Sequence, residues 1–356
     1  MKNPKVSIII PIYRVADYIA ACLNSVIAQD YKNIEVLLID DCTPDDSIVI
    51  AQNIINNYNG SIEFKIVRHQ TNLKQAAARN TGIREAKGEY LFFLDSDDKL
   101  ALNAISSLVR EAVESGAEVT TANRKAVDWM TGKIYKMLED DYPNLRIEHI
   151  DNIPYGIQIH GTVWNKLIKR DFVIDNNLFF EEGIIYEDDL WMFKLYCCRP
   201  SFSCIMDITY IYHIRQSSTM QTYSEHHLLS RIIVAQKAIA YLPLVRSEML
   251  GYANVSAENF RQGALMSCLT NTVGLMSYTR LYKYLHQYKI GFIDYMTSKY
   301  ATPVAKLRFI GNMMPTCIGK WWNLLFIKML LWKDRHSYPY LTNGKIELST
   351  SFWNKL

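Results

Sequence analysis

Phe93-Leu94-Asp95-Ser96-Asp97-Asp98 is the stretch that decides the fold of this 356-residue chain, because an apolar run opens directly onto three carboxylates. Residues 89–94 are expected to form a buried strand of a parallel sheet, where continuous apolar sequence is typical. Ligands collect beyond the carboxyl ends of such strands, so these acids are expected to lie at a site. Crowded carboxylates raise one another's pKa, and a cation beside them keeps them ionised, which favours Mg2+ or Mn2+. A solvated turn with a helix N-cap uses the same residue types and stays an alternative.

Strand and helix patterns alternate on the N-terminal side of this stretch. The β-branched run 6–10 ends at Pro11, and the next segment carries apolar residues at helical spacing. Further strands are expected over residues 34–39 and 62–67, and further helices over residues 46–58 and 75–86, while another strand, over residues 117–121, follows the quoted stretch. Alternating units of this kind predict an α/β fold with a doubly wound, mostly parallel sheet.

The composition excludes several classes of protein. At 49% hydrophobic, the chain can bury a large core, and a net charge of +3 without a basic block argues against nucleic acid as the main partner. Seven cysteines without a Cys-x-x-Cys pair argue against a disulfide framework and a zinc knuckle, and predict reduced thiols in a cytoplasmic protein. The N-terminus lacks the pattern of a signal peptide, and no apolar run reaches the length of a transmembrane helix.

Three regions are expected along the chain. Residues 1–120 carry the alternating pattern of a nucleotide-binding half, residues 121–223 have the mixed periodicity of a region that caps a site, and residues 224–356 are helical. Within the last region, residues 320–335 combine an apolar run with tryptophans at both ends and flanking cations. This pattern favours a helix lying in a membrane interface, and a packing helix or a homodimer contact is the alternative.

Acidic and basic side chains outside the first stretch also have functional and structural interpretations. Asp40 and Asp41 follow a strand, where they could accept hydrogen bonds from a base or a ribose, or cap a turn. The guanidinium of Arg79 suits a phosphate or a carboxylate. Glu187 and Asp188 open an apolar-striped helix, where they could act as a general base or complement the helix dipole.

In their order and spacing, these motifs resemble the family 2 inverting glycosyltransferases of the GT-A fold, especially bacterial polysaccharide and capsule enzymes. The resemblance covers residues 4–220 and rests on five segments: residues 6–13, 39–46, 72–82 and 164–166, and the Asp-x-Asp motif at 95–98, with Glu187-Asp188 continuing the series. It implies a GT-A fold with a helical C-terminal extension. It also implies transfer of a sugar from a nucleotide-sugar donor, with a UDP-sugar preferred, to a hydroxyl of a glycan or lipid-linked acceptor. Mn2+ or Mg2+ would be the cofactor, and the enzyme would work in the cytoplasm or peripherally on the inner face of the membrane.

The resemblance also assigns roles to individual residues. Asp188 would be the catalytic base, with Glu187 the second candidate, and Asp97 would bind the metal. His213 stands where an arginine is common, and it is either a third metal ligand, a contact to the diphosphate or a structural histidine. Nucleotide binding would fall to Pro11, Tyr13, Asp40, Asp41, Arg79, Asp95 and Ser96. The donor sugar and the acceptor would meet Asp98, Trp164, Lys166, Arg215 and Ser218.

Besides His213, three loop segments depart from the family pattern. Arg14 replaces a usual Asn, Cys42 begins Cys-Thr-Pro in place of Gly-Ser-Thr, and Lys74 replaces a usual Gly. Because none of these changes removes an acid, the chemistry is expected to survive, and the changes bear on the identity of the donor and on the shape of the loops. Two other classes stay open: a metal-dependent nucleotidyltransferase, which would prefer a Gly- and Lys/Arg-rich loop after the first strand, and a catalytically silent nucleotide-binding scaffold.

Overall fold

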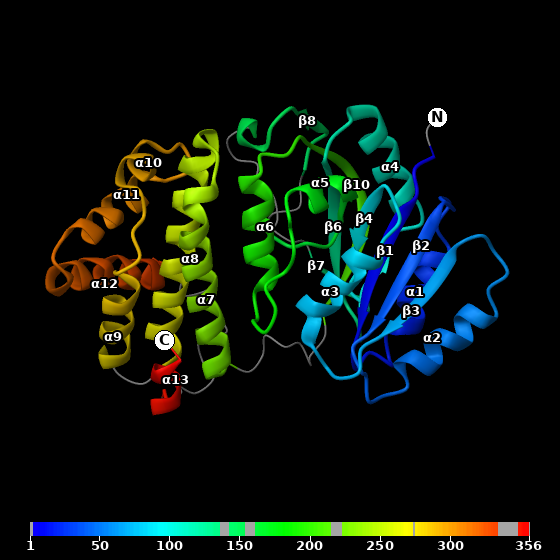
Figure 1. The fold of residues 1–356 in the computed structure, drawn as a ribbon, viewed down its shortest axis with the longest axis horizontal. Helices are drawn as coiled ribbons and strands as arrows, with labels where there is room; N and C mark the ends of the chain where they lie inside the picture. The colour runs from blue at the N-terminus through cyan, green and yellow to red at the C-terminus, as the bar shows by residue number, and fades with distance from the viewer. Residues whose placement is uncertain are drawn as a thin grey trace. The chain divides into compact units, whose positions relative to one another are not determined.

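The computed structural model divides the chain into two compact units (Figure 1). It describes residues 3–135, 142–153, 161–214, 223–272, 275–333 and 348–355. Unit 1 comprises Met1–Gly183 and Glu187–Gln216, and unit 2 comprises Ile184–Tyr186 and Ser217–Leu356.

A ten-stranded sheet forms the centre of unit 1, with helices packed on it (Figure 1). Its strand order is β3-β2-β1-β4-β9-β6-β10-β5, with β7 paired to β6 and β8 paired to β10. The strands are β1 Val6–Ile12, β2 Ile34–Asp40, β3 Glu63–Arg68, β4 Tyr90–Phe93, β5 Lys99–Leu100, β6 Val119–Asp128, β7 Ile134–Tyr135, β8 Leu145–Ile147, β9 Lys166–Lys169 and β10 Phe202–Ile214. The helices of this unit are α1 Ile19–Ile27, α2 Ser47–Asn56, α3 Lys74–Glu85, α4 Ala104–Ser115, α5 Arg170–Asp175 and α6 Glu187–Cys197.

The first four strands of the chain pair in parallel, as the alternating pattern predicts. β1 lies between β2 and β4, and β3 pairs with β2. The other half of the sheet is mixed, because β9 runs antiparallel to both β4 and β6, whereas β10 is parallel to β6. The predicted α/β fold is therefore confirmed, with the antiparallel strands confined to the half that follows β4.

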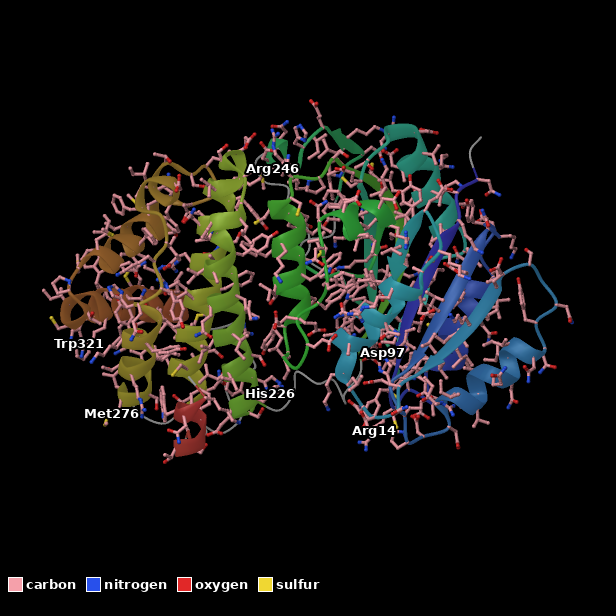
Figure 2. All side chains as sticks on the ribbon, viewed as in Figure 1. Arg14, Asp97, His226, Arg246, Met276 and Trp321 are labelled. Carbon is pink, nitrogen blue, oxygen red and sulfur yellow. The ribbon has the colours of Figure 1, made fainter. Side chains whose placement is uncertain are left out.

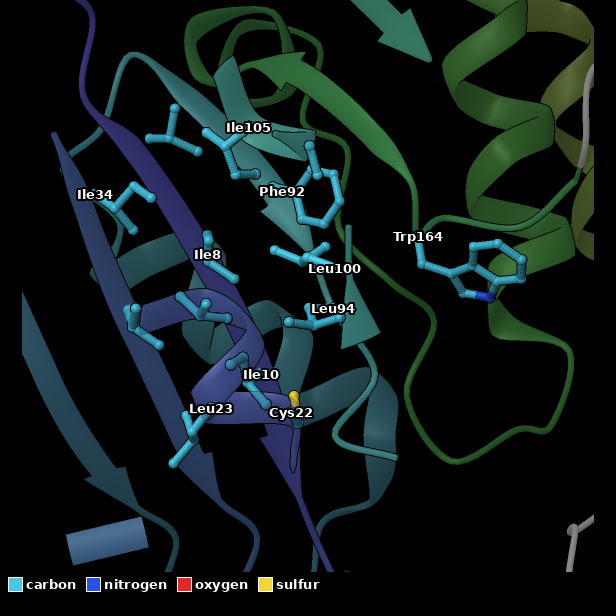
Figure 3. Packing of buried hydrophobic residues seen from close by; sticks show 14 of the residues in the cluster. Ile8, Ile10, Cys22, Leu23, Ile34, Phe92, Leu94, Leu100, Ile105 and Trp164 are labelled. Carbon is cyan, nitrogen blue, oxygen red and sulfur yellow. The ribbon is translucent and has the colours of Figure 1, made fainter. Parts of the chain in front are cut away.

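Close packing of apolar side chains fixes β1 and β4 in the middle of the sheet (Figure 3). Ile8 and Ile10 of β1 are fully buried beside Leu23 of α1, and Phe92 of β4 is buried in the same cluster. The loops at the carboxyl ends of β1 and β4 are therefore attached to tightly packed strands.

Three of the departures from the family pattern, at Arg14, Cys42 and Lys74, share one backbone feature. Arg14, Cys42 and Lys74 all have positive φ angles, of 54°, 56° and 74°. Glycine adopts this left-handed region without steric cost and asparagine tolerates it, whereas other residues lose about 1–2 kcal/mol there. The loops beyond β1 and β2 and the start of α3 thus keep a conformation that their side chains disfavour.

Lys74 offers a direct measurement of this strain. We expect Lys74→Gly to have a free energy of unfolding about 1 kcal/mol higher than that of Lys74→Ala, because only glycine removes the clash at positive φ. The Lys74 side chain is exposed, so both variants lose little packing. Urea denaturation of the two variants measures the difference, and equal midpoints would contradict the strain.

Unit 2 is helical, as the sequence predicts (Figure 1). Its helices are α7 Glu225–Tyr241, α8 Leu250–Asn271, α9 Leu275–Leu285, α10 Phe292–Thr297, α11 Pro303–Phe309, α12 Thr316–Lys333 and α13 Thr350–Asn354. Buried residues of α7, α8, α9 and α12 share one apolar cluster. Within the described ranges, no helix combines the length and apolar composition that crossing a bilayer requires.

Candidate active site

A buried guanidinium joins two acidic motifs that lie far apart in the sequence. Arg79 of α3 donates from Nη2 to Asp95 Oδ1 and from Nη1 to Glu187 Oε1, each at 2.9 Å. The Arg79 side chain is only 3% exposed, so water screens these ion pairs weakly. The acids beyond β4 and the acids at the start of α6 therefore belong to one network.

Small residues allow α3 to carry Arg79 into this network. Gly82 lies so close to β1 that a Cβ atom on it would approach Ile9 Cγ2 to 2.3 Å. Ala76, Ala77 and Ala78 are buried on the same helix. Close packing of α3 on the sheet thus holds the Arg79 backbone near the ends of the central strands.

Asp188 follows Glu187 in the first turn of α6. Burial raises the pKa of Asp188, and the nearby Arg79 guanidinium opposes this rise. Burial also raises the pKa of Glu187, again opposed by Arg79. One Asp188 oxygen, Oδ1, accepts the backbone N–H of Asp189 at 3.0 Å. A carboxylate with a raised pKa is a better proton acceptor, which is what a general base needs.

Lys166 is a buried cation close to this acid. Its Nζ donates to the Thr162 carbonyl oxygen at 2.5 Å. Burial, together with the nearby Arg124 cation, lowers the pKa of Lys166 to about 7, and Asp188 partly offsets this. Lys166 is therefore poised between its charged and neutral forms near neutral pH.

The low pKa of Lys166 makes folding depend on pH in a defined direction. Between about pH 7 and 10.5 the unfolded chain holds the Lys166 proton and the folded chain does not. Stability therefore rises with pH in this window, by up to about 1.4 kcal/mol per unit. Relative to Lys166→Met, we expect the wild type to gain about 2–3 kcal/mol in free energy of unfolding from pH 7 to pH 9.

Urea denaturation at the two pH values measures this gain. The exposed Lys87 gives the matched control, because Lys87→Met should follow the wild-type profile. Parallel profiles for the wild type and Lys166→Met would rule out a depressed pKa at Lys166.

Trp164 lies inside an aromatic stack. Its ring packs on Tyr210 with centroids 4.5 Å apart and on Tyr212 at 5.8 Å. The Arg124 guanidinium lies 4.7 Å from the centre of the Trp164 ring. Trp164 is 8% exposed and joins the edge of the main apolar cluster (Figure 3). The structure thus gives Trp164 a packing role beside the buried Lys166.

Asp41 fastens the loop after β2 to the start of α3. Its carboxylate accepts the backbone N–H groups of Leu73 and Lys74, each at 2.8 Å, and lies 2.8 Å from His69 Nδ1. Asp40 accepts the Thr43 N–H at 2.9 Å and Arg68 Nε at 2.7 Å. Both acids are buried, and their hydrogen bonds to backbone N–H groups hold the loop after β2 in shape.

Asp98 ties the loop after β4 to β10. Its two carboxylate oxygens accept the Tyr210 hydroxyl and the His213 backbone N–H, each at 2.8 Å. Burial raises the pKa of Asp98 well above its usual range, and the neighbouring Asp97 and Asp95 add to the rise. Tyr210 also accepts the Asp95 backbone N–H at 3.2 Å. The sequence gives no signal for Tyr210, because a tyrosine in a strand is ordinary.

Asp97 lies in the loop beyond the end of β4 (Figure 2). Within the described residues, no group of three or more His, Cys, Asp or Glu side chains is arranged to hold a metal. A divalent cation bound to a nucleotide needs only one or two carboxylates, since phosphate oxygens fill other positions. His213 Nδ1 is buried without a hydrogen-bond partner in that part of the chain and lies 4.0 Å from Asp98 Oδ1. Burial lowers the pKa of His213 to about 4, which keeps the imidazole in its metal-binding neutral form. Asp97 and His213 therefore suit a divalent cation that is also bound by the phosphate oxygens of the substrate.

The remaining candidates lie at the ends of strands or outside the described residues. Pro11 is in β1 opposite Ile39 of β2, Tyr13 follows β1 and is exposed, and Ser96 is buried beyond β4. Arg215 and Ser218 lie outside the described residues.

Comparison with known proteins identifies the family. The family model described as glycosyl transferase family 2 matches residues 7–175. An uncharacterized glycosyltransferase of Haemophilus influenzae is 37% identical over 242 residues, which are 59% of this chain and 94% of that protein. The chain belongs to glycosyl transferase family 2. As a member of this family, it is an enzyme that transfers a glycosyl group, and the resemblance noted in the sequence is confirmed.

This family 2 glycosyltransferase is also similar to a named biosynthetic protein in sequence and to a solved crystal structure in fold. The succinoglycan biosynthesis protein ExoO of Rhizobium meliloti is 25% identical over 244 residues, which are 67% of this chain and 68% of that protein. The crystal structure of S. aureus TarS 1–349 in complex with UDP-GlcNAc superposes with a TM-score of 0.70 at 18% identity, and covers 94% of this chain and 92% of that one. This likeness shows the fold, so the expected GT-A fold is confirmed.

Proposed function

We propose that this glycosyltransferase moves a sugar, with inversion, from a UDP-sugar to a hydroxyl of a glycan or lipid-linked acceptor in cell-surface polysaccharide synthesis. The observation that carries the proposal is the Arg79 network, which joins Asp95 to Glu187 and lies beside Asp188. ExoO, by its name, acts in succinoglycan biosynthesis, and TarS has been crystallised with UDP-GlcNAc. The first supports a polysaccharide product, and the second supports an activated-sugar donor.

Asp188 is the base in this proposal. The acceptor oxygen attacks the anomeric carbon as its proton passes to the Asp188 carboxylate, and the bond from that carbon to the diphosphate oxygen breaks. The electron pair leaves with the UDP, and the configuration at the carbon inverts. Arg79 keeps Glu187 paired, so that Asp188 is the carboxylate left to accept the proton.

The residues beyond β1, β2 and β4 would hold the nucleotide. Pro11, Tyr13, Asp95 and Ser96 line this end of the sheet, while Asp40 and Asp41 shape the loop through their backbone contacts. Asp97, with His213, would hold Mn2+ or Mg2+, which when bound neutralises charge on the leaving diphosphate. Asp98 would hold the loop that carries Asp97 in position. The donor sugar and the acceptor would be bordered by Trp164, Lys166, Arg215 and Ser218.

The proposal also assigns the three regions of the chain. Residues 1–120 would bind the nucleotide-sugar, and residues 121–223 would supply the base and the acceptor side. Residues 224–356 would serve attachment, and the protein would work in the cytoplasm against the inner face of the membrane.

Metal-dependent hydrolysis of UDP-sugars tests this function. With Mn2+, the wild type should release UDP slowly from one or more UDP-sugars, and Asp97→Asn should weaken metal-dependent UDP binding at least about tenfold, because one metal ligand is lost. Calorimetric titration with UDP, with and without Mn2+, measures the binding. Asp171, an exposed acid of α5, gives the matched control in Asp171→Asn. Nucleotide binding without release of UDP from any donor would favour a silent scaffold, and release of pyrophosphate from a nucleoside triphosphate would favour a nucleotidyltransferase.

A further inference from the structure

α12 exposes a continuous apolar stripe. Its buried face includes Asn323, Leu324 and Ile327, which pack into unit 2. The opposite face is apolar as well, although it is exposed, and Trp321 and Trp332 on it are 53% and 70% accessible. The stripe consists of Ile318, Trp321, Leu325, Met329 and Trp332, at the spacing of one helix face. Figure 2 shows Trp321 on the outside of this helix. An apolar stripe of this size on a surface indicates an interaction site.

α11 extends this surface through a rigid hairpin with α12. The two helices are joined through the 3-10 turn Ile310–Met313, and Trp322 Nε1 donates to the Leu307 carbonyl oxygen at 3.0 Å. A Cβ atom on Gly319 would lie 2.3 Å from the Gly311 carbonyl oxygen, so the segments approach as closely as glycine allows. The hairpin also exposes Val304, Leu307 and Met313. These three residues and the α12 stripe together are called the apolar face below.

The charge around the apolar face is strongly one-sided. Residues 259–333 contain ten lysines and arginines and a single acid, Asp294, whereas the whole chain has a net charge of only +3. Lys320 and Lys328 lie on α12 itself, and Lys306 lies on α11. Two copies of this face would bring like charges together, which opposes a symmetric homodimer through it. Anionic lipid headgroups would complement the charge, at about 1 kcal/mol for each Lys or Arg near the surface.

A cationic cavity lies on the same unit. It has a volume of about 550 Å³ and is lined by Arg261, His286 and Lys289 beside the apolar Phe292 and Met313. Arg261 is 4% exposed, and its guanidinium pairs with the buried Glu258 and donates to the Tyr288 carbonyl oxygen, which leaves only Nε without a hydrogen-bond partner within the described residues. The exposed Lys289 therefore supplies most of the net positive charge of this lining. Burial and the cations Lys289 and Arg261 lower the pKa of His286. The positive lining suits the headgroup phosphate of a lipid. The acyl chains of that lipid would lie along the exposed apolar side chains next to the cavity.

We propose that the apolar face docks unit 2 on an anionic lipid surface. Trp321, Leu325 and Met329 enter the boundary between headgroups and acyl chains, while Lys320 and Lys328 contact the headgroups. Trp321 and Trp332 both stand on this stripe, and the amphipathic ring of tryptophan favours the headgroup region over the hydrocarbon core. The docking rests on the attachment role proposed above for residues 224–356 and gives it a surface and a lipid charge, and it is independent of the chemistry assigned to unit 1.

Vesicle sedimentation tests the docking. The full chain should sediment with vesicles of phosphatidylglycerol and phosphatidylcholine and remain in solution with phosphatidylcholine alone. The double variant Trp321→Glu/Leu325→Glu should bind at least about tenfold more weakly, because two exposed apolar side chains no longer enter the interface. Lys320→Glu/Lys328→Glu should also lose about tenfold or more, and high salt should reduce wild-type binding.

Two matched variants control for general effects of surface charge. Val49 is an exposed apolar residue of α2, and Lys87 is an exposed cation, both in unit 1. Val49→Glu and Lys87→Glu should bind vesicles as the wild type does. All variants should keep the wild-type affinity for UDP in solution, which separates a failure of docking from a failure of the proposed function.

Three results would overturn the docking. The first is equal sedimentation with anionic and neutral vesicles, and the second is unchanged binding of Trp321→Glu/Leu325→Glu. The third is a wild-type dimer in solution, without vesicle binding, that this double variant converts to monomer, because the apolar face would then be a contact between two copies of the chain.

Discussion

Asp188→Asn is expected to lower kcat by about 10²–10⁴-fold and to leave UDP-sugar binding nearly unchanged. The amide keeps the size of the carboxylate and cannot accept a proton from the acceptor hydroxyl. Asp188 is not among the atoms that hold the nucleotide loops, so the donor pocket should keep its shape. Steady-state transfer rates and calorimetric UDP titrations measure the two effects separately.

The pH profile tests the same assignment without removing the base. Because burial raises the pKa of Asp188, kcat/KM should fall about tenfold per unit below that raised value and level off above it. Glu187→Gln removes a neighbouring negative charge, which lowers the pKa of Asp188 and should move the acid limb to lower pH. If Glu187→Gln abolished turnover and Asp188→Asn retained turnover, Glu187 and not Asp188 would be the catalytic base.

Asp189→Asn is the matched control for the loss of one acid in this turn. The Asp189 backbone N–H, and not its side chain, donates to Asp188, so the variant keeps this contact and should retain most activity. Equal losses in Asp188→Asn and Asp189→Asn would show that the acidic turn matters as a whole and that neither side chain is the base.

The pattern of the sequence predicted the parallel half of the sheet, because β1, β2 and β4 are mostly apolar and β3 alternates charged and apolar residues. β2 is buried at every position, and its limits lie within one residue of the expected strand. The second half has no such signal. β6 continues through the buried polar residues Asn123 and Arg124, where a hydropathy pattern ends. The Asn123 amide is satisfied by the carbonyl oxygens of Tyr142 and Met206, which lie far away in the sequence.

For the candidate site, too, the sequence indicated individual residues but not the contacts between residues that lie far apart in the chain. The sequence located Arg79, Asp95 and Glu187 as separate candidates. Asp95 and Glu187 stand at the end or start of an expected element, and Arg79 offers a guanidinium inside an expected helix. It could not pair Arg79 with Glu187, which lies 108 residues further on, because a guanidinium suits a phosphate as well as a carboxylate. The backbone contacts of Asp41 were equally hidden, because they depend on how the loop after β2 meets α3.

Arg79→Met is expected to destabilise the fold by about 3 kcal/mol, because Asp95 and Glu187 lose their shared counter-charge. Arg79 is 3% exposed and the Glu187 side chain 9%, so water cannot replace the lost ion pair at the Glu187 end. Activity should fall with it, since the Glu187 and Asp188 carboxylates would compete for protons. Arg79→Lys should rescue only part of the loss, because one ammonium group cannot form the two separate contacts of the guanidinium.

A double-mutant cycle separates this electrostatic effect from lost packing. In Arg79→Met/Glu187→Gln the buried carboxylate is neutral, so the loss in free energy of unfolding should be smaller than the sum of the two single losses by about 1–3 kcal/mol. Urea denaturation of the four proteins gives the coupling energy. Lys65→Met/Glu85→Gln, across an ion pair whose side chains are 51% and 39% exposed, should couple by less than about 1 kcal/mol. Additive losses at Arg79 and Glu187 would mean that the two side chains stabilise the fold independently, and the network that supports the active site would then not exist as a unit.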